Sequence, residues 1–241
     1  MSKKRARSAE GCAGPIGLGV SLVRGLDAVS PTRPISVLPA WETPEAETRA
    51  ITLRPLCQED RSAYVALVNA SMNELRQFLP AFSLGQSADS HFEDELERTI
   101  RGDETRSAWR RVILYQQRLV GMASLINISR GLTLSADTSW WIGTPFTGRG
   151  LAKSALRLMV RQAFAPLAEG LGLHRLYATI APENTASIRL ALGLGFVRFP
   201  AEDHHLHMSH GWKRHQCYLA EVHATTLPEL KPGLPRASEL L

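Results

Sequence analysis

The sequence predicts an α+β fold, with helices flanking a mixed, mostly antiparallel central sheet. Strand-like and helix-like segments follow one another in the order β-α-α-β-β-β-α-β-α-β between residues 50 and 222. The strands at 109–115 and 119–128 are close enough for a hairpin, whereas a helical segment separates the strands at 138–143 and 174–181 and indicates a β-α-β unit. The 241 residues, 44% hydrophobic and 21% charged, suffice for one sizeable core.

The first half of this region predicts one strand and two helices. AITLRPL (50–56) alternates as a short strand. The segment 58–79 is a predicted helix that Pro80 ends, and ADSHFEDELERTIRG (88–102) is a second, polar helix. The apolar positions at helical spacing in the first helix are Tyr64, Leu67, Val68 and Leu75.

The second half predicts the hairpin, the β-α-β unit and a closing strand. Residues 116–118 connect the hairpin strands, and TSWWIG (138–143) is the third strand. An amphipathic helix over 151–165 has one apolar stripe. The stripe consists of Ala155, Leu156, Met159, Val160 and Ala163. The last elements are HRLYATIA (174–181, strand), a short helix within 183–196 and KRHQCYLAEV (213–222, strand).

The flanks of this region have a different composition. Residues 1–48 are rich in Gly, Pro and Ala without periodicity, and predict a flexible N-terminal extension. The basic start, MSKKRARS, precedes a mildly apolar stretch, as in a signal peptide, but Pro15 and several glycines interrupt that stretch. We therefore expect one domain over 49–225 and a C-terminal tail over 226–241.

Charge, hydropathy and cysteine usage exclude several function classes. A net charge of +5 without a basic stripe and interleaved aromatics argues against a nucleic-acid partner. No apolar run approaches membrane-spanning length, so we expect no membrane partner. Cys12, Cys57 and Cys217 are far apart and odd in number, which suits neither a disulfide framework nor a zinc site and favours the cytoplasm.

The stretch FTGRGLAKSAL (146–156) is a glycine-rich turn between a strand and a helix. It is not a P-loop, because with Lys153-Ser154 in place the required glycines fall on Thr147 and Ala152. A turn at a helix start still offers free N–H groups and the positive end of the helix dipole to an anion. Gly148 and Gly150 permit close backbone approach. A tight turn that binds nothing is the alternative.

Two long blocks and a closing strand carry a family resemblance. They are WWIGTPFTGRGLAKSAL (140–156), LHRLYATIAPENTASIRLALGLGF (173–196) and WKRHQCY (212–218). With these blocks in order, the chain resembles the GNAT acetyltransferases, most closely the RimJ/RimL-type protein N-acetyltransferases, over about residues 50–222. The resemblance implies the GNAT fold, N-acetyltransferase activity and acetyl-CoA as co-substrate.

The resemblance also implies a set of cofactor-binding residues. Trp141, Ile142 and Gly143 would run beside the pantetheine arm, and Asn184 would hydrogen-bond that arm near its reactive end. The pyrophosphate would be lined by Thr147, Gly148, Arg149, Gly150, Leu151 and Ala152. The family motif opens with Gln or Arg where this chain has Thr147, so a long donor side chain is missing and Arg149 is the candidate to compensate.

Acetyl transfer to an amine requires a neutral nucleophile, a polarised thioester carbonyl and a proton for the leaving thiolate. A backbone N–H within 140–142 is placed to polarise the carbonyl. By resemblance, Ser187 supplies the proton; the alternative is a serine that only caps the helix start. Candidate bases are Asp137, His205 and His207. A weak base suffices for an α-amine, whose pKa is near ~8 against ~10.4 for Lys.

Five histidines are crowded between residues 204 and 215, namely His204, His205, His207, His210 and His215. His-rich tracts can bind metal, but no Cys or acidic residue has zinc spacing here. We therefore expect no metal and predict a loop that lines the acceptor site.

The favoured function is N-acetylation of a protein N-terminal α-amine, of the ribosomal-protein type. A small-molecule amine is the second hypothesis for the acceptor. The third is a CoA-binding module without turnover. The acceptor preference rests on the resemblance, because one fold serves many acceptors.

Overall fold

The computed structural model describes residues 50–78, 86–208 and 211–222. The predicted extension 1–48, the tail 226–241, the helix stop at Pro80 and His210 lie outside these residues. Within them the expected order of strands and helices is confirmed, and short elements are added near the end.

The strands form one sheet in the order β1-β2-β3-β4-β5-β8-β6, with β7 paired to β8 alone. All pairs are antiparallel except β4–β5, which is parallel, so the predicted mixed, mostly antiparallel sheet is confirmed. The strands are β1 (Ile51–Arg54), β2 (Trp109–Tyr115), β3 (Arg118–Ser129), β4 (Ser135–Ile142), β5 (Arg175–Ile180), β6 (Val197–Arg198), β7 (His204–Met208) and β8 (Gly211–Glu221).

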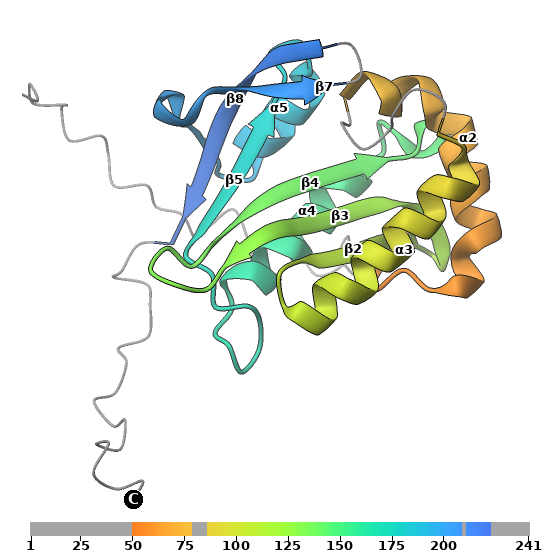
Figure 1. Ribbon diagram of the computed structural model, residues 1–241, viewed down its shortest axis with the longest axis horizontal. Coiled ribbons are helices and arrows are strands. Elements are labelled where there is room, and N and C mark those ends of the chain that lie inside the picture. Colours follow the sequence, from red (N-terminus) through yellow and green to blue (C-terminus); the bar gives the residue numbers. More distant parts are fainter. Residues whose placement is uncertain (1–49, 79–85, 209–210, 223–241) are drawn as a thin grey trace, which may run out of the picture. The chain divides into compact units, whose positions relative to one another are not determined.

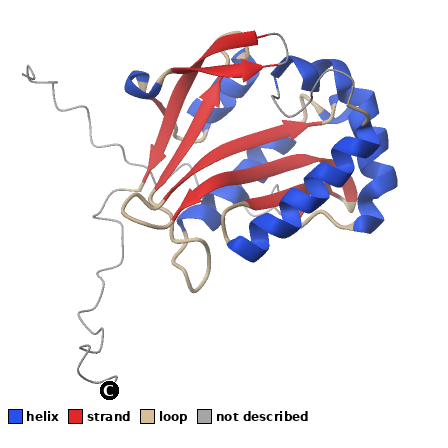
Figure 2. Ribbon diagram, in the orientation of Figure 1, coloured by secondary structure: helices blue, strands red, loops and turns tan. Residues whose placement is uncertain are grey.

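Helices lie on both faces of this sheet (Figures 1 and 2). On one face, α2 and α3 lie over β2 and β3; on the other, α4 connects β4 to β5 and α5 follows β5. The helices are α2 (Arg61–Phe78), α3 (Ala88–Thr105), α4 (Leu151–Phe164) and α5 (Thr185–Gly193), and the 3-10 turns are η2 (Gln58–Asp60), η3 (Thr144–Phe146) and η4 (Pro200–Glu202). None of these helices combines the length and hydropathy that a membrane-spanning segment requires.

The side chains of β4 alternate between two hydrophobic cores. Trp141 packs in the core under α2 and α3, with its ring edge-on to Tyr64 at 5.9 Å. Trp140 packs against the core under α4 and α5. The two tryptophan rings thus take opposite faces of the strand, because successive side chains of a strand alternate.

A buried polar group stabilises α2 against α3 in the first of these cores. Tyr64 Oη and His91 Nδ1 are 2.9 Å apart, and both residues are buried. The buried carboxylate of Glu95 accepts hydrogen bonds from Arg98 and Arg110, the latter on β2. Burial lowers the pKa of His91, because the charged imidazolium loses its water.

Two local expectations are wrong. The segment around His204–Met208 is a strand paired with the start of β8, whereas we expected a loop. Its apolar positions, Leu206 and Met208, alternate with histidines, so the strand pattern was present but hidden by unusual composition. The hairpin connection is a two-residue turn at Gln116 and Gln117, with φ values of 49° and 64°, rather than three residues. Positive φ at both positions matches the strand twist.

Two glycines allow close approach around the end of β4. A Cβ on Gly121 of β3 would lie 2.1 Å from the Trp141 carbonyl oxygen, and one on Gly143 would lie 2.2 Å from Leu67 Cδ1 of α2. The neighbour of Gly121 is backbone and cannot turn aside. Glycine at position 121 is therefore required for β3 and β4 to pair at this point.

We expect Gly121→Ala to lower the free energy of unfolding by about 3 kcal/mol, at the upper end of overpacking effects. Urea denaturation followed by circular dichroism measures this change. The matched control is Gly131→Ala, where a Cβ would meet nothing within 4 Å. Equal stability of the two variants would contradict the steric argument.

Candidate active site

The central feature of the site is that β4 and β5 separate. Their pairing runs from Ser135–Arg175 to Asp137–Tyr177 and then stops, although β4 continues to Ile142 and β5 to Ile180. At the next position the Thr138 hydroxyl donates to the Tyr177 carbonyl oxygen at 2.9 Å. Figure 1 shows the two strands diverging towards their C-terminal ends.

Separation leaves backbone amides of β4 without strand partners. Gly143 N–H donates to the Val120 carbonyl on β3 at 2.8 Å. Because successive residues of an antiparallel strand direct their N–H and C=O groups to opposite sides, the amides of Trp140 and Ile142 are directed towards β5. These two amides thus line the unpaired edge, whereas those of Trp141 and Gly143 are directed towards β3.

The glycine turn follows at the same end of the sheet. Gly148 and Gly150 have φ values of 75° and 74°, which residues with a side chain rarely adopt. A Cβ at either position would meet nothing within 4 Å. Gly150 is the N-cap of α4 and no side chain caps this helix start. The first-turn amides of Leu151 and Ala152 therefore have no partner within the helix, and amides in this position can bind an anion.

Polar and charged side chains around the turn take different positions. Arg149 is exposed, and its guanidinium lies 5.7 Å from the centroid of the Phe146 ring. Lys153 is exposed on the first turn of α4. The Thr147 hydroxyl donates back to the Thr144 carbonyl oxygen at 3.0 Å. Positive charge at the turn therefore comes from Arg149 and Lys153, and the Thr147 hydroxyl is used within the turn.

The start of α5 lies at this end of the sheet because β4 and β5 are parallel. Asn184 is the N-cap of α5, and its Oδ1 accepts the Ser187 N–H at 3.1 Å. The capping role considered for the Ser187 side chain thus belongs to Asn184. Ser187 is half-buried, and within the described residues we find no hydrogen bond of its hydroxyl. The Asn184 side-chain N–H₂ group is still available as a donor.

Asp137 lies at the last β4–β5 pair. Asp137 and Trp141 are four positions apart on β4, which is two full strand repeats, so both side chains point to the α2/α3 face. Asn127 donates its Nδ2 hydrogen to Asp137 Oδ2 at 2.7 Å. Asn127 has φ of 53° and lies where the β3–β4 register shifts, an irregularity typical of functional sites. Sequence reasoning missed Asn127, because a bulge has no clear pattern.

The candidate bases His205 and His207 lie on β7, away from Asp137. They share one face of the β7–β8 hairpin with Arg214 and Trp212, and both are exposed. The His207 ring packs edge-on to Trp212 at 5.3 Å. The buried His215 and Met208 belong to the opposite face. In the described part of the chain, no three His, Cys, Asp or Glu side chains are grouped so as to hold a metal ion.

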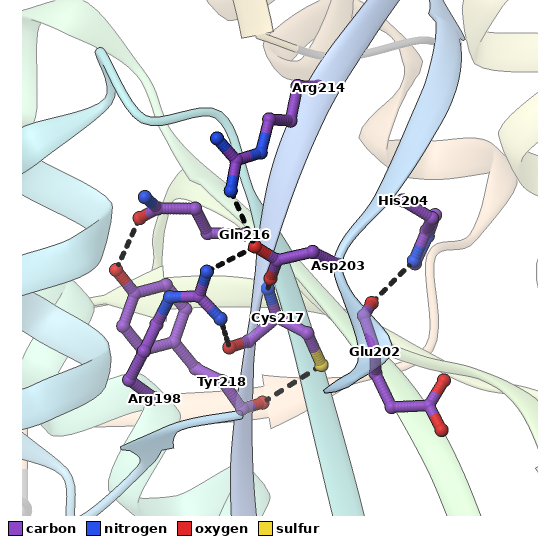
Figure 3. Close-up of polar contacts among 8 residues, drawn as sticks. All are labelled: Arg198, Glu202, Asp203, His204, Arg214, Gln216, Cys217 and Tyr218. Atoms are coloured by element: carbon purple, nitrogen blue, oxygen red, sulfur yellow. Dashed lines mark hydrogen bonds and ion pairs between the residues drawn. The ribbon is translucent and has the colours of Figure 1, made fainter. Parts of the chain in front are cut away.

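An acidic centre that sequence reasoning missed stabilises the chain between β6 and β8 (Figure 3). The Asp203 carboxylate accepts hydrogen bonds from Arg198, from Arg214 at 3.2 Å and from the Cys217 N–H at 3.0 Å. Arg198 also donates to the Cys217 carbonyl oxygen at 3.1 Å. The hydrogen bond from Arg198, reinforced by the other two, lowers the pKa of Asp203 to about 2.

The structure thus brings the predicted cofactor residues to one end of the sheet and divides the predicted catalytic residues. The edge at Ile142, the turn at Gly148–Gly150 and the cap at Asn184 all follow the C-terminal ends of β4 and β5. Asp137 faces the α2/α3 side, whereas Ser187 belongs to a helix that packs on the α4 side.

Comparison with known proteins shows the family of this chain. The sequence profile of the acetyltransferase (GNAT) domain matches residues 50–197. The probable N-acetyltransferase YjcK of Bacillus subtilis is 26% identical over 186 residues, which cover 70% of this chain and 92% of YjcK. The putative ribosomal N-acetyltransferase YdaF of the same organism is 27% identical over 147 residues, which cover 61% of this chain and 78% of YdaF.

The fold is also similar to that of solved structures. The structure of Mycobacterium smegmatis RimJ in complex with CoA-disulfide has a TM-score of 0.63 and 23% sequence identity. The match covers 74% of this chain and 84% of that one. At this identity the likeness shows a shared fold.

The lowered pKa of Asp203 predicts a pH-dependent contribution to stability. The carboxylate is ionised in the folded chain down to about pH 2 and in the unfolded chain only above its ordinary pKa near ~4. Its stabilisation is therefore complete above about pH 4 and is lost as the pH falls through 2. We expect Asp203→Asn to unfold at a lower urea concentration than wild type at pH 7. The gap, which is the difference between the two urea midpoints, should narrow between pH 4 and 2.

Urea titrations at pH 7, 4 and 2.5 measure this gap. Glu104→Gln, at an exposed position of α3, is the matched control and should match wild type at pH 7. A gap of constant size across this pH range would contradict the assigned role of the carboxylate.

Proposed function

Because the chain belongs to the GNAT acetyltransferase family, we propose that it transfers the acetyl group of acetyl-CoA to the α-amine of a protein N-terminus. The family assignment supports acetyl transfer from acetyl-CoA. The protein N-terminus as acceptor is supported by the resemblance to RimJ/RimL-type enzymes and by the relative named a putative ribosomal N-acetyltransferase.

The observation that carries this proposal is an uncapped glycine turn beside an unpaired strand edge. Coenzyme A has a pyrophosphate, which suits the free amides and positive dipole end at Gly148–Ala152. It also has an amide-containing pantetheine arm, which can pair with the free edge of β4 at Trp140 and Ile142 as an added strand would. Arg149 and Lys153 supply positive charge for the phosphates.

Acetyl-CoA supplies the acetyl group as a thioester, and the residues of the chain handle the charges and protons. The free N–H of Ile142 or Trp140 donates to the thioester carbonyl oxygen and stabilises the negative charge that develops there. The Ser187 hydroxyl donates a proton to the departing sulfur. The Asn184 N–H₂ group, oriented by its capping oxygen, holds the pantetheine arm close to Ser187.

Among the candidate bases we favour Asp137. It lies where β4 and β5 begin to separate, so it is the one candidate adjacent to the free edge of β4. The hydrogen bond from Asn127 orients its carboxylate. His205 and His207 lie on the exposed face of a hairpin, where His207 packs against Trp212. An α-amine with a pKa near ~8 needs only such a weak base.

The open side of the sheet supports a chain end as acceptor. Asp137, Tyr177 and Thr179 are half-buried on the α2/α3 face, and in Figure 1 none of the described helices covers β5 there. A sheet face that none of the described helices covers can admit a peptide whose other end extends into solvent. The unpaired thiols of Cys57 and Cys217 support a cytoplasmic location as part of this proposal.

The test is thiol release from acetyl-CoA with three versions of one peptide: free N-terminus, blocked N-terminus, and blocked N-terminus with one lysine. We expect release with the first peptide alone. Ser187→Ala and Asp137→Asn should each lower kcat by about 100-fold, as for loss of a general acid or base. Neither should change the Kd for acetyl-CoA measured by calorimetry.

Thr185→Ala, an exposed hydroxyl on the same turn of α5, is the control for Ser187, and His205→Ala is the control for the base. Both should retain wild-type kcat. If only small amines support turnover, the acceptor is a small molecule and not a peptide. If the protein binds acetyl-CoA but no amine causes thiol release, the protein is a CoA-binding module.

A further inference from the structure

Helix α2 contacts the chain segment that connects β4 to the glycine turn at successive points. Tyr64 packs on Trp141, Leu67 occupies the space over Gly143, and Ser71 accepts the Thr144 N–H at 2.9 Å. Positions 64, 67 and 71 are three and four residues apart, so they form one stripe of the helix. One face of α2 thus contacts three of the four residues from 141 to 144.

The last of these contacts continues to the turn itself. The Ser71 side chain is fully buried, and its Oγ accepts the first N–H of η3. The Thr144 carbonyl oxygen in turn accepts the Thr147 hydroxyl at 3.0 Å and the Thr147 N–H at 3.3 Å. Thr147 precedes Gly148. A continuous chain of hydrogen bonds therefore runs from the interior of α2 to the start of the glycine turn.

We propose that Ser71 and Thr147 are positioning residues that hold the glycine turn in its anion-binding conformation, and so set the affinity for acetyl-CoA. This inference rests on the proposed function of the turn. Ser71 is buried below η3 and cannot touch the cofactor, so it acts through Thr144. Thr147 acts in the same way, because its hydroxyl is donated into the turn rather than out of it.

This role explains why position 147 has threonine where the family motif has Gln or Arg. A long donor side chain there would reach the phosphates directly but could not close the turn onto Thr144 as the short hydroxyl does. In this chain the affinity comes from a preorganised turn, since two glycines with positive φ are otherwise free to take many conformations. Direct charge comes from Arg149, which is held near Phe146.

The experiment compares the Kd of acetyl-CoA by calorimetry for wild type, Ser71→Ala, Thr147→Val and the double variant. Each single substitution should weaken binding about fivefold, the effect of losing one hydrogen bond of roughly 1 kcal/mol net. The double variant should be little weaker than either single one, because both act on one chain of bonds. Thr147→Ser should retain wild-type affinity. KM for acetyl-CoA should rise, with kcat and the KM for the acceptor unchanged.

Ser62→Ala, at an exposed position of α2, is the matched control and should bind as wild type does. Thermal melts without ligand verify that each variant is folded at the temperature of the titration. Wild-type Kd in Ser71→Ala would overturn the proposal, and so would additive losses in the double variant, which would make Thr147 a direct ligand. Failure of wild type itself to bind acetyl-CoA would instead refute the proposed function of the turn.

Discussion

The site depends on one constraint: the parallel pair β4–β5 stops at Asp137–Tyr177 while both strands continue. A paired strand satisfies its amides with its neighbour, so an edge free to bind a ligand inside a sheet exists only where two strands separate. Because the strands are parallel, the helices that follow them, α4 and α5, both begin at the widening end. One departure from regular pairing thus supplies a free edge and two helix N-termini together.

The two faces of the sheet are not equivalent around this opening. The face with Asp137 and Tyr177 is covered by α2 and α3 only over the first strands, whereas α4 and α5 pack a continuous core on the other face. In the proposed reaction the amine enters from the first side and the sulfur leaves towards Ser187 on the second. The proposed base, Asp137, and the proposed acid, Ser187, therefore lie on opposite sides of the reacting thioester.

Much of the fold could be predicted from the sequence, because local residue patterns determine it. The order of elements, the helix after the glycine turn and the opposite faces of Trp140 and Trp141 follow from periodicity, which local residues determine. The β7 strand was missed because histidines occupy alternate positions of a short apolar pattern. The contacts Asn127–Asp137, Ser71–Thr144 and Arg198–Asp203 join residues on different elements or across irregular backbone, and no spacing rule relates such partners.

The helix cap at Asn184 has a consequence for which residues this position can accept. Serine, threonine or aspartate would cap α5 about as well, since each offers an oxygen to the Ser187 N–H. Asparagine alone among the good caps has an amide with a separate N–H₂ group, and accepting through Oδ1 directs that group away from the helix. In the proposed function, the bound cofactor therefore requires asparagine at position 184, while the helix itself would tolerate several alternatives. In the proposed function, the helix cap and the contact with the cofactor share this one side chain, so neither can change without the other.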